Sequence, residues 1–198
     1  MLFPTIEFGI FFLIVFAASW AVRGWPEARK LLLVGASYFF YGWWDWRFLG
    51  LLFLSTVINY LAGLALARTE RVGLRKFIVG VAVVAGLSIL GFFKYYGFFL
   101  TSFATLLEAA GLERDLPFMQ VILPVGISFF TFQGISYVVD VYRRHASAEK
   151  SLLNVMLYIS FFPQLVAGPI VRAADFLPQL HRAAVLTRAH IGVGVVLI

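Results

Sequence analysis

Residues 121–142 read VILPVGISFFTFQGISYVVDVY, a run that is long and apolar enough to cross a membrane as a helix. Its polar residues recur at helical spacing, so Gln133, Ser136, Tyr137 and Asp140 share one face. A polar stripe on a membrane helix faces the protein interior or a water-filled path. The stripe is therefore a candidate substrate path, and close packing inside the protein is the alternative.

The composition of the whole chain also indicates a membrane protein. Of its 198 residues, 62% are hydrophobic and 13% are charged. Soluble domains carry about 25% charged residues, so this chain has too little polar surface to face water. The net charge of +6 comes from short basic clusters between apolar runs, which argues against a nucleic-acid-binding surface. The absence of cysteine excludes disulfides and thiolate chemistry.

We therefore expect an all-α, polytopic transmembrane protein in contact with the lipid bilayer. The first apolar run has no basic residues before it and no cleavage site after it, so it is expected to be a retained helix rather than a signal peptide. The apolar runs are Phe8–Val22, Leu31–Trp44, Phe48–Ala67, Phe77–Phe93 with a mixed stretch to Ala110, Val121–Tyr142, Leu152–Ile170 and the helix start Ile191–Ile198. The second run, of 14 residues, is shorter than the roughly 20 that a membrane helix needs, so we expect it either to tilt into the Asp45–Arg47 corner or not to cross fully.

The loop charges predict an orientation. The connections at 23–30, 68–76 and 143–150 are basic and should be cytoplasmic, whereas 108–115 is acidic and should lie outside. This arrangement places the N-terminus in the periplasm.

The run Leu152–Ile170 conflicts with this orientation, because the loop that follows it is also basic. Pro163 and the pair Gly168 and Pro169 interrupt helical hydrogen bonding there. We expect a re-entrant or broken helix near 160–172. Gln164 and Arg172 flank the break, where they could hydrogen-bond a thioester carbonyl or a phosphate, or else satisfy backbone groups that the prolines leave free.

The sequence has no metal-binding or nucleophile motif, and we expect no metal site. His145, His181 and His190 fall in expected loops, where a solvated histidine is the more frequent role. Asp140 lies three and four residues before Arg143 and Arg144, so an ion pair is favoured over a catalytic role.

Two long motifs resemble the membrane-bound O-acyltransferase family, in its alginate O-acetyltransferase branch. They are LPVGISFFTFQ at 123–133, continued by SYVVDVYR at 136–143, and FFPQLVAGPIVR at 161–172. Weaker likeness covers ASYFFYGWW at 36–44 and FFKY at 92–95. Within these motifs Pro124, Asp140, Arg143, Pro163, Gly168 and Pro169 are expected to be structural, and Gln133, Tyr137, Gln164 and Arg172 are candidates for the substrate path.

The resemblance implies a multi-pass enzyme of the bacterial inner membrane. Such an enzyme takes an acyl group from a cytoplasmic thioester donor, such as acetyl-CoA or an acyl carrier, with no bound cofactor. It passes the group across the membrane to a periplasmic partner protein that modifies a cell-surface polysaccharide, alginate and peptidoglycan among the open acceptors. A transporter or flippase-like component, or a truncated paralogue with a structural role, is the alternative.

The family's catalytic histidine lies in a later motif that nothing in residues 1–198 matches. We therefore expect a single transmembrane domain that is the N-terminal part of such an enzyme, cut within the helix that starts near residue 191.

Residues 1–198 alone should be inactive, because a general base must take the proton of the acceptor hydroxyl. The measurement is transfer of labelled acetyl by the purified 1–198 segment. Any transfer above background would contradict this expectation.

Overall fold

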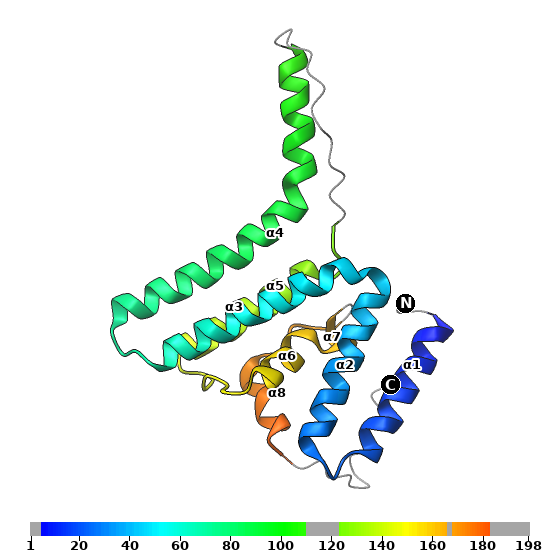
Figure 1. Cartoon of the computed structure of the whole chain (residues 1–198). Coiled ribbons are helices and arrows are strands. Elements are labelled where there is room, and N and C mark those ends of the chain that lie inside the picture. The colour runs from blue at the N-terminus through cyan, green and yellow to red at the C-terminus, as the bar shows by residue number, and fades with distance from the viewer. Residues whose placement is uncertain (1–4, 110–122, 166–167, 183–198) are drawn as a thin grey trace.

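The computed structural model describes residues 5–109, 123–165 and 168–182, which form helices and connections without a strand (Figure 1). The elements are α1 (Ile6–Ala21), α2 (Pro26–Asp45), the 3₁₀ turn η1 (Trp46–Phe48), α3 (Leu49–Ala67), α4 (Val72–Ala109), α5 (Ile127–Tyr142), α6 (Leu152–Ser160), α7 (Phe162–Leu165) and α8 (Ala173–Leu180). The expected all-α class is confirmed for these residues. The expected helix start at 191 and most of the 108–115 connection lie outside them.

Helix α2 is longer than its apolar run. It begins at Pro26, a residue favoured in the first helical turn, and has 20 residues. Lys30 pairs with Glu27 at 2.8 Å, and an i,i+3 pair of this kind stabilises the first turns of a helix. The apolar run is shorter than the helix because α2 also includes the polar residues that precede the run.

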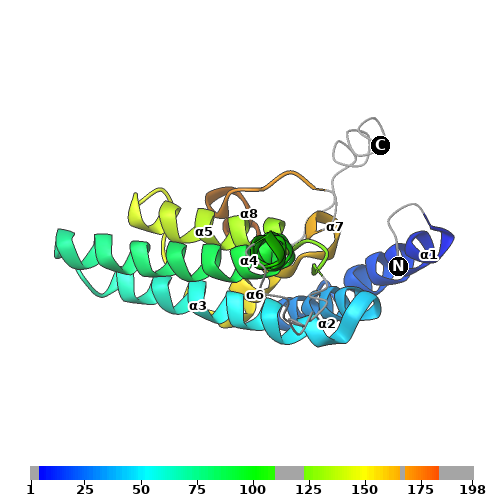
Figure 2. The same ribbon diagram turned by 90° about the horizontal axis from the view of Figure 1, so that it is seen from above.

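Helix α4 continues without interruption for 38 residues, so Lys94, Tyr95 and Tyr96 do not end it. At about 1.5 Å per residue it is about 57 Å long. Its first part lies beside α3 and α5, and its second part bends away from the other helices (Figure 1). Figure 2 shows this second part nearly end-on. The segments 26–67 and 72–107 are both long and apolar enough to cross a membrane.

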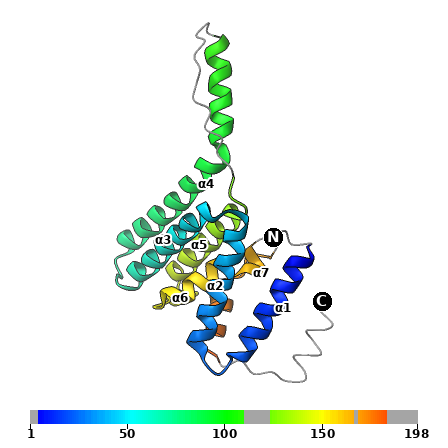
Figure 3. The ribbon, with the colours of Figure 1, turned by 45° about the vertical axis from the view of Figure 1, so that its right-hand side comes forward.

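Helix α5 is the centre of the packing. It lies against α3, α4, α6 and α8, and Phe130, Tyr137 and Val138 on it have no exposed surface. Helix α1 lies at the edge of the bundle beside α2 (Figure 3), where Phe11 packs against Phe40 and Phe162. The helix α5 begins only after Gly126, whose φ of +74° is a left-handed conformation that favours glycine.

Two glycines allow α3 and α5 to lie close together. A Cβ atom on Gly63 would come within 2.6 Å of the Tyr137 hydroxyl oxygen, and one on Gly134 would collide with the amide nitrogen of Asn59. Small residues at such contacts let membrane helices approach closely. The contact therefore positions Asn59 and Tyr137, the polar residues discussed below.

Gly134→Ala should destabilise the full-length protein by about 1–3 kcal/mol, because the added methyl group overpacks this contact. Gly80→Ala on α4 is the matched control, since a Cβ atom there meets nothing within 4 Å. The measurement is thermal unfolding of both variants in detergent. Equal melting temperatures for Gly134→Ala and the wild type would show that the helices are not in close contact here.

Candidate functional site

Three of the four residues of the polar stripe on α5 are buried, Ser136 being only partly buried, and the buried polar residues continue onto two neighbouring helices. We call the resulting cluster the polar seam. Each of its side chains is more than nine-tenths buried: Asn59 on α3, Gln133, Tyr137 and Asp140 on α5, and Asn154 and Tyr158 on α6. The stripe therefore faces the protein interior.

Hydrogen bonds tie the polar seam to the surrounding backbone. Gln133 Nε2 donates to the Tyr158 carbonyl at 3.3 Å. The Tyr137 hydroxyl accepts from the backbone N–H of Glu149 at 3.1 Å. The Tyr158 hydroxyl donates to the Val171 carbonyl at 2.9 Å, which connects the seam to the segment before α8.

Four oxygen atoms of the polar seam have no hydrogen-bond partner among the described residues. They are Asn59 Oδ1, Gln133 Oε1, Asp140 Oδ2 and Asn154 Oδ1, and all four are acceptors. A buried polar atom without a partner costs free energy comparable to a lost hydrogen bond. The seam is therefore suited to a hydrogen-bond donor such as water or a polar group of a substrate.

The expected ion pair of Asp140 is wrong for the described residues. Arg144 instead pairs with Glu70 in the connection between α3 and α4. Helix α5 ends at Tyr142, and Arg144 then adopts a positive φ of 62°, so helical i,i+4 geometry no longer applies to it. The side chain of Arg143 is exposed.

The apolar run from 152 is broken, as its prolines and glycine predicted. Helix α6 ends at Ser160, and α7 has only four residues. The Phe162 N–H donates to Ser37 Oγ at 3.2 Å, which ties this segment to α2. A Cβ atom on Gly126 would lie 2.9 Å from the Leu165 carbonyl oxygen, so the start of α5 packs tightly on α7. The first part of the break, α7, is thus packed against α2 and the start of α5, whereas Pro169, Ile170 and Arg172 are exposed.

The two residues that flank the break differ in their surroundings. Gln164 Oε1 is buried without a partner, while its backbone carbonyl accepts from Gly168 N–H at 3.1 Å. Arg172 is exposed and lies at the start of α8. Neither side chain hydrogen-bonds a backbone group of the described residues, so the purely structural alternative for them is not observed. Their role in a substrate path stays a prediction.

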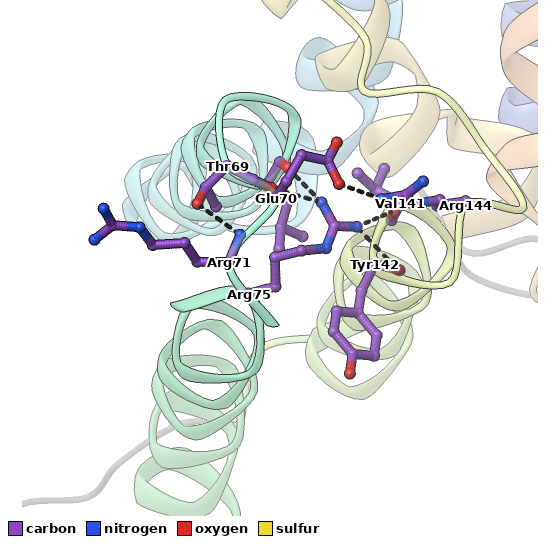
Figure 4. Close-up of polar contacts among 8 residues, drawn as sticks. Thr69, Glu70, Arg71, Arg75, Val141, Tyr142 and Arg144 are labelled. Carbon is purple, nitrogen blue, oxygen red and sulfur yellow. Dashed lines mark hydrogen bonds and ion pairs between the residues drawn. The ribbon is translucent and has the colours of Figure 1, made fainter. Parts of the chain in front are cut away.

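Sequence reasoning missed Arg75, which is 8% exposed. Its guanidinium donates to the carbonyls of Leu66 at 2.6 Å and Thr69 at 3.1 Å, at the end of α3. It also donates to the carbonyls of Val141 at 3.4 Å and Tyr142 at 3.0 Å, at the end of α5 (Figure 4). The helix dipole favours a cation at a helix C-terminus, and the Arg75 guanidinium contacts the C-termini of two helices, α3 and α5.

His181 was expected to be solvated, but it contacts Glu149 at 2.9 Å, although it remains exposed. Burial alone would raise the pKa of Glu149. Hydrogen bonds from His181, from the backbone of Ser151 and from Asn154 outweigh burial and lower that pKa below its ordinary value. The carboxylate therefore stays ionised at neutral pH, and its contribution to stability is lost only as the pH falls through the lowered pKa.

An open groove of about 560 Å³ lies elsewhere, on the second part of α4. It is lined by Gly91, Phe92, Tyr96, Phe99, Leu100, Ser102 and Leu106. Its walls are almost wholly apolar, and none of the polar seam residues lines it. The seam, which carries the ionisable and hydrogen-bonding groups, remains the better candidate for chemistry.

Comparison with known proteins finds clear relatives. The chain is 37% identical to the probable alginate O-acetylase AlgI of Azotobacter vinelandii over 95% of its own length and 38% of that protein's length. It is 38% identical to the protein of the same name in Pseudomonas aeruginosa, over 91% and 35% of the two lengths. It is 35% identical to the peptidoglycan O-acetyltransferase of Helicobacter pylori, over 78% and 33%. The chain thus spans 33% to 38% of the length of these relatives. No protein-family model and no solved structure matches it.

Arg75→Met should destabilise the full-length protein by about 3 kcal/mol, because it leaves buried carbonyls at two helix ends without donors. Lys76→Met, the exposed neighbour, is the matched control and should change stability by less than about 0.5 kcal/mol. Chemical unfolding in detergent measures both. Equal stabilities of the two variants would refute the role of Arg75.

Proposed function

The chain belongs with the alginate and peptidoglycan O-acetyltransferases, in keeping with its resemblance to the membrane-bound O-acyltransferase family, and from this relationship we propose that it is the N-terminal part of an acetyltransferase membrane subunit. This subunit takes an acetyl group from a cytoplasmic thioester donor, such as acetyl-CoA or an acyl carrier. It passes the group across the inner membrane to a periplasmic partner, which modifies a cell-surface polysaccharide such as alginate.

The proposed multi-pass arrangement, with a periplasmic N-terminus, is supported by the position of two basic connections. Contacts of Arg75 and Arg144 bring 68–76 and 143–150 together at one end of α3, α4 and α5. Connections that carry basic charge favour the cytoplasmic side. Because the two connections are neighbours in the structure, both can lie on the cytoplasmic side of the membrane.

The observation that carries the proposal is the buried polar seam beside a broken helix, in a chain related to named O-acetylases. We propose that the segment 160–172 is re-entrant, because irregular backbone at membrane depth is tolerated where protein surrounds it or where it lines a cavity. Gln133, Tyr137 and Gln164 would then line the path of the acyl group, and Arg172 would lie at its mouth.

The attack of an acceptor hydroxyl on a thioester carbonyl needs a general base. Asp140 is the only carboxylate of the seam within the described residues, and the family resemblance assigns the base to a histidine in a later motif instead. We therefore propose that residues 1–198 supply the path and its scaffold. The remaining length of the full protein would supply the base.

Gln133→Met keeps the size of the side chain but removes the amide from the seam. In the full-length protein it should lower acetyl transfer about 10- to 100-fold, because the seam loses a hydrogen-bonding group that the acyl path uses. The measurement is transfer of labelled acetyl from acetyl-CoA to polymer in membrane vesicles that contain the periplasmic partner.

Phe132→Leu is the control on the same helix, since Phe132 is 45% exposed and is not part of the seam. It should leave transfer unchanged. Normal transfer by Gln133→Met, with unchanged melting temperature, would remove the seam from the path. A vesicle assay in which intact polysaccharide crosses the membrane and no acetyl group is transferred would favour the transporter alternative.

A further inference from the structure

Four exposed basic side chains surround the end of the bundle that Arg75 holds together. They are Arg68 at the end of α3, Arg71 and Lys76 at the start of α4, and Arg143 at the end of α5. We call them the basic surface. It draws on two connections that are about 70 residues apart in the sequence, so it exists only in the folded chain.

The fold removes the negative charge from the basic surface. Glu70 is the one carboxylate in the connection between α3 and α4, and Arg144 is paired with it. None of the four residues forms an ion pair with a carboxylate of the described chain. Figure 4 shows the Arg71 side chain extending away from the carbonyl contacts of Arg75. The basic surface therefore has free donors and no internal counter-ion.

The position of these residues selects a type of anion. Arg68 and Arg143 are the residues that directly follow α3 and α5, and Lys76 lies in the second turn of α4. Basic residues within one turn of the end of a membrane helix lie at the level of the lipid headgroups. A guanidinium matches the geometry of a phosphate group with two parallel hydrogen bonds.

We propose that the basic surface is a binding site for the phosphate of anionic phospholipids, such as phosphatidylglycerol. The site rests on the proposed membrane-spanning arrangement of α3, α4 and α5 but not on acetyl transfer. A bound lipid would join the ends of the three helices from outside, as Arg75 does from inside.

A lipid headgroup fits better than a soluble phosphate compound. A soluble ligand of that kind needs a concave site that surrounds it, whereas all four basic side chains are exposed. The four cations instead lie around the helix ends, where several headgroups can approach together.

The test compares the full-length wild type with Arg68→Gln/Arg71→Gln/Arg143→Gln. Both are purified in detergent and transferred to nanodiscs of phosphatidylcholine with a minor fraction of phosphatidylglycerol, and the co-purifying lipid is counted by mass spectrometry. The wild type should enrich phosphatidylglycerol, and the triple variant should bind it at least about tenfold more weakly, with the difference reduced at high salt.

The control variant is Arg23→Gln/Lys94→Gln/Arg182→Gln, which removes three exposed cations outside the basic surface. It should retain the wild-type enrichment. Equal enrichment in all three proteins, or an equal loss in both variants, would overturn the proposal. So would binding of inorganic pyrophosphate in pure phosphatidylcholine nanodiscs that only the first triple variant loses, because the ligand would then be a soluble phosphate.

Two further measurements test separately the membrane arrangement, on which the lipid site rests, and the enzyme function. Labelling of Arg71→Cys by a membrane-impermeant thiol reagent in inverted membrane vesicles, but not in intact cells, reports the membrane arrangement. Acetyl transfer by the wild type reports the enzyme function. If the wild type shows no lipid enrichment but is labelled and transfers acetyl groups as expected, the lipid site is refuted while the membrane arrangement and the enzyme function stand.

Discussion

The arrangement of α3, α4 and α5 depends on one buried guanidinium, which lies near the start of one of these helices and hydrogen-bonds the C-terminal ends of the other two. Arg75 lies in the first turn of α4, and its nitrogens donate to carbonyls at the C-termini of α3 and α5. Carbonyls at a helix end have no partner within the helix, so they must find a donor elsewhere when they are buried. Because this one side chain satisfies both ends, the three helices are fixed relative to one another at this point.

The other polar residues take their places from that arrangement. With α3 and α5 joined at their ends, Gly63 and Gly134 allow the two helices to stay close along their length, and Asn59 and Tyr137 come to lie in the interface. Helix α6 packs against both α3 and α5, and the Tyr158 hydroxyl on it donates to the Val171 carbonyl. The polar seam and the broken segment are thus parts of the same packing.

The sequence predicts much of this fold and less of its detail. Apolar length located α1 and α3 to within a few residues, and the proline and glycine positions located the break after Ser160. Apolar length underestimated α2, which begins with polar residues. Charge spacing failed for Asp140, because Arg144, one of its two expected partners, pairs with Glu70 instead. The role of Arg75 could not be predicted, because the residue lies in a basic segment and its four hydrogen-bond acceptors are backbone carbonyls, which leave no pattern in the sequence.

The carbonyl acceptors of Arg75 lie in two parts of the sequence, at residues 66–69 and 141–142, and are therefore synthesised at different times. The carbonyls of Leu66 and Thr69 are available as soon as α4 begins, whereas those of Val141 and Tyr142 emerge later. At about 5–20 residues per second, synthesis from residue 75 to residue 141 takes roughly 3 to 13 s. During this interval the guanidinium has only two of its four carbonyl acceptors, so the contact that fixes α3 and α4 to α5 can be completed only after α5 has been made.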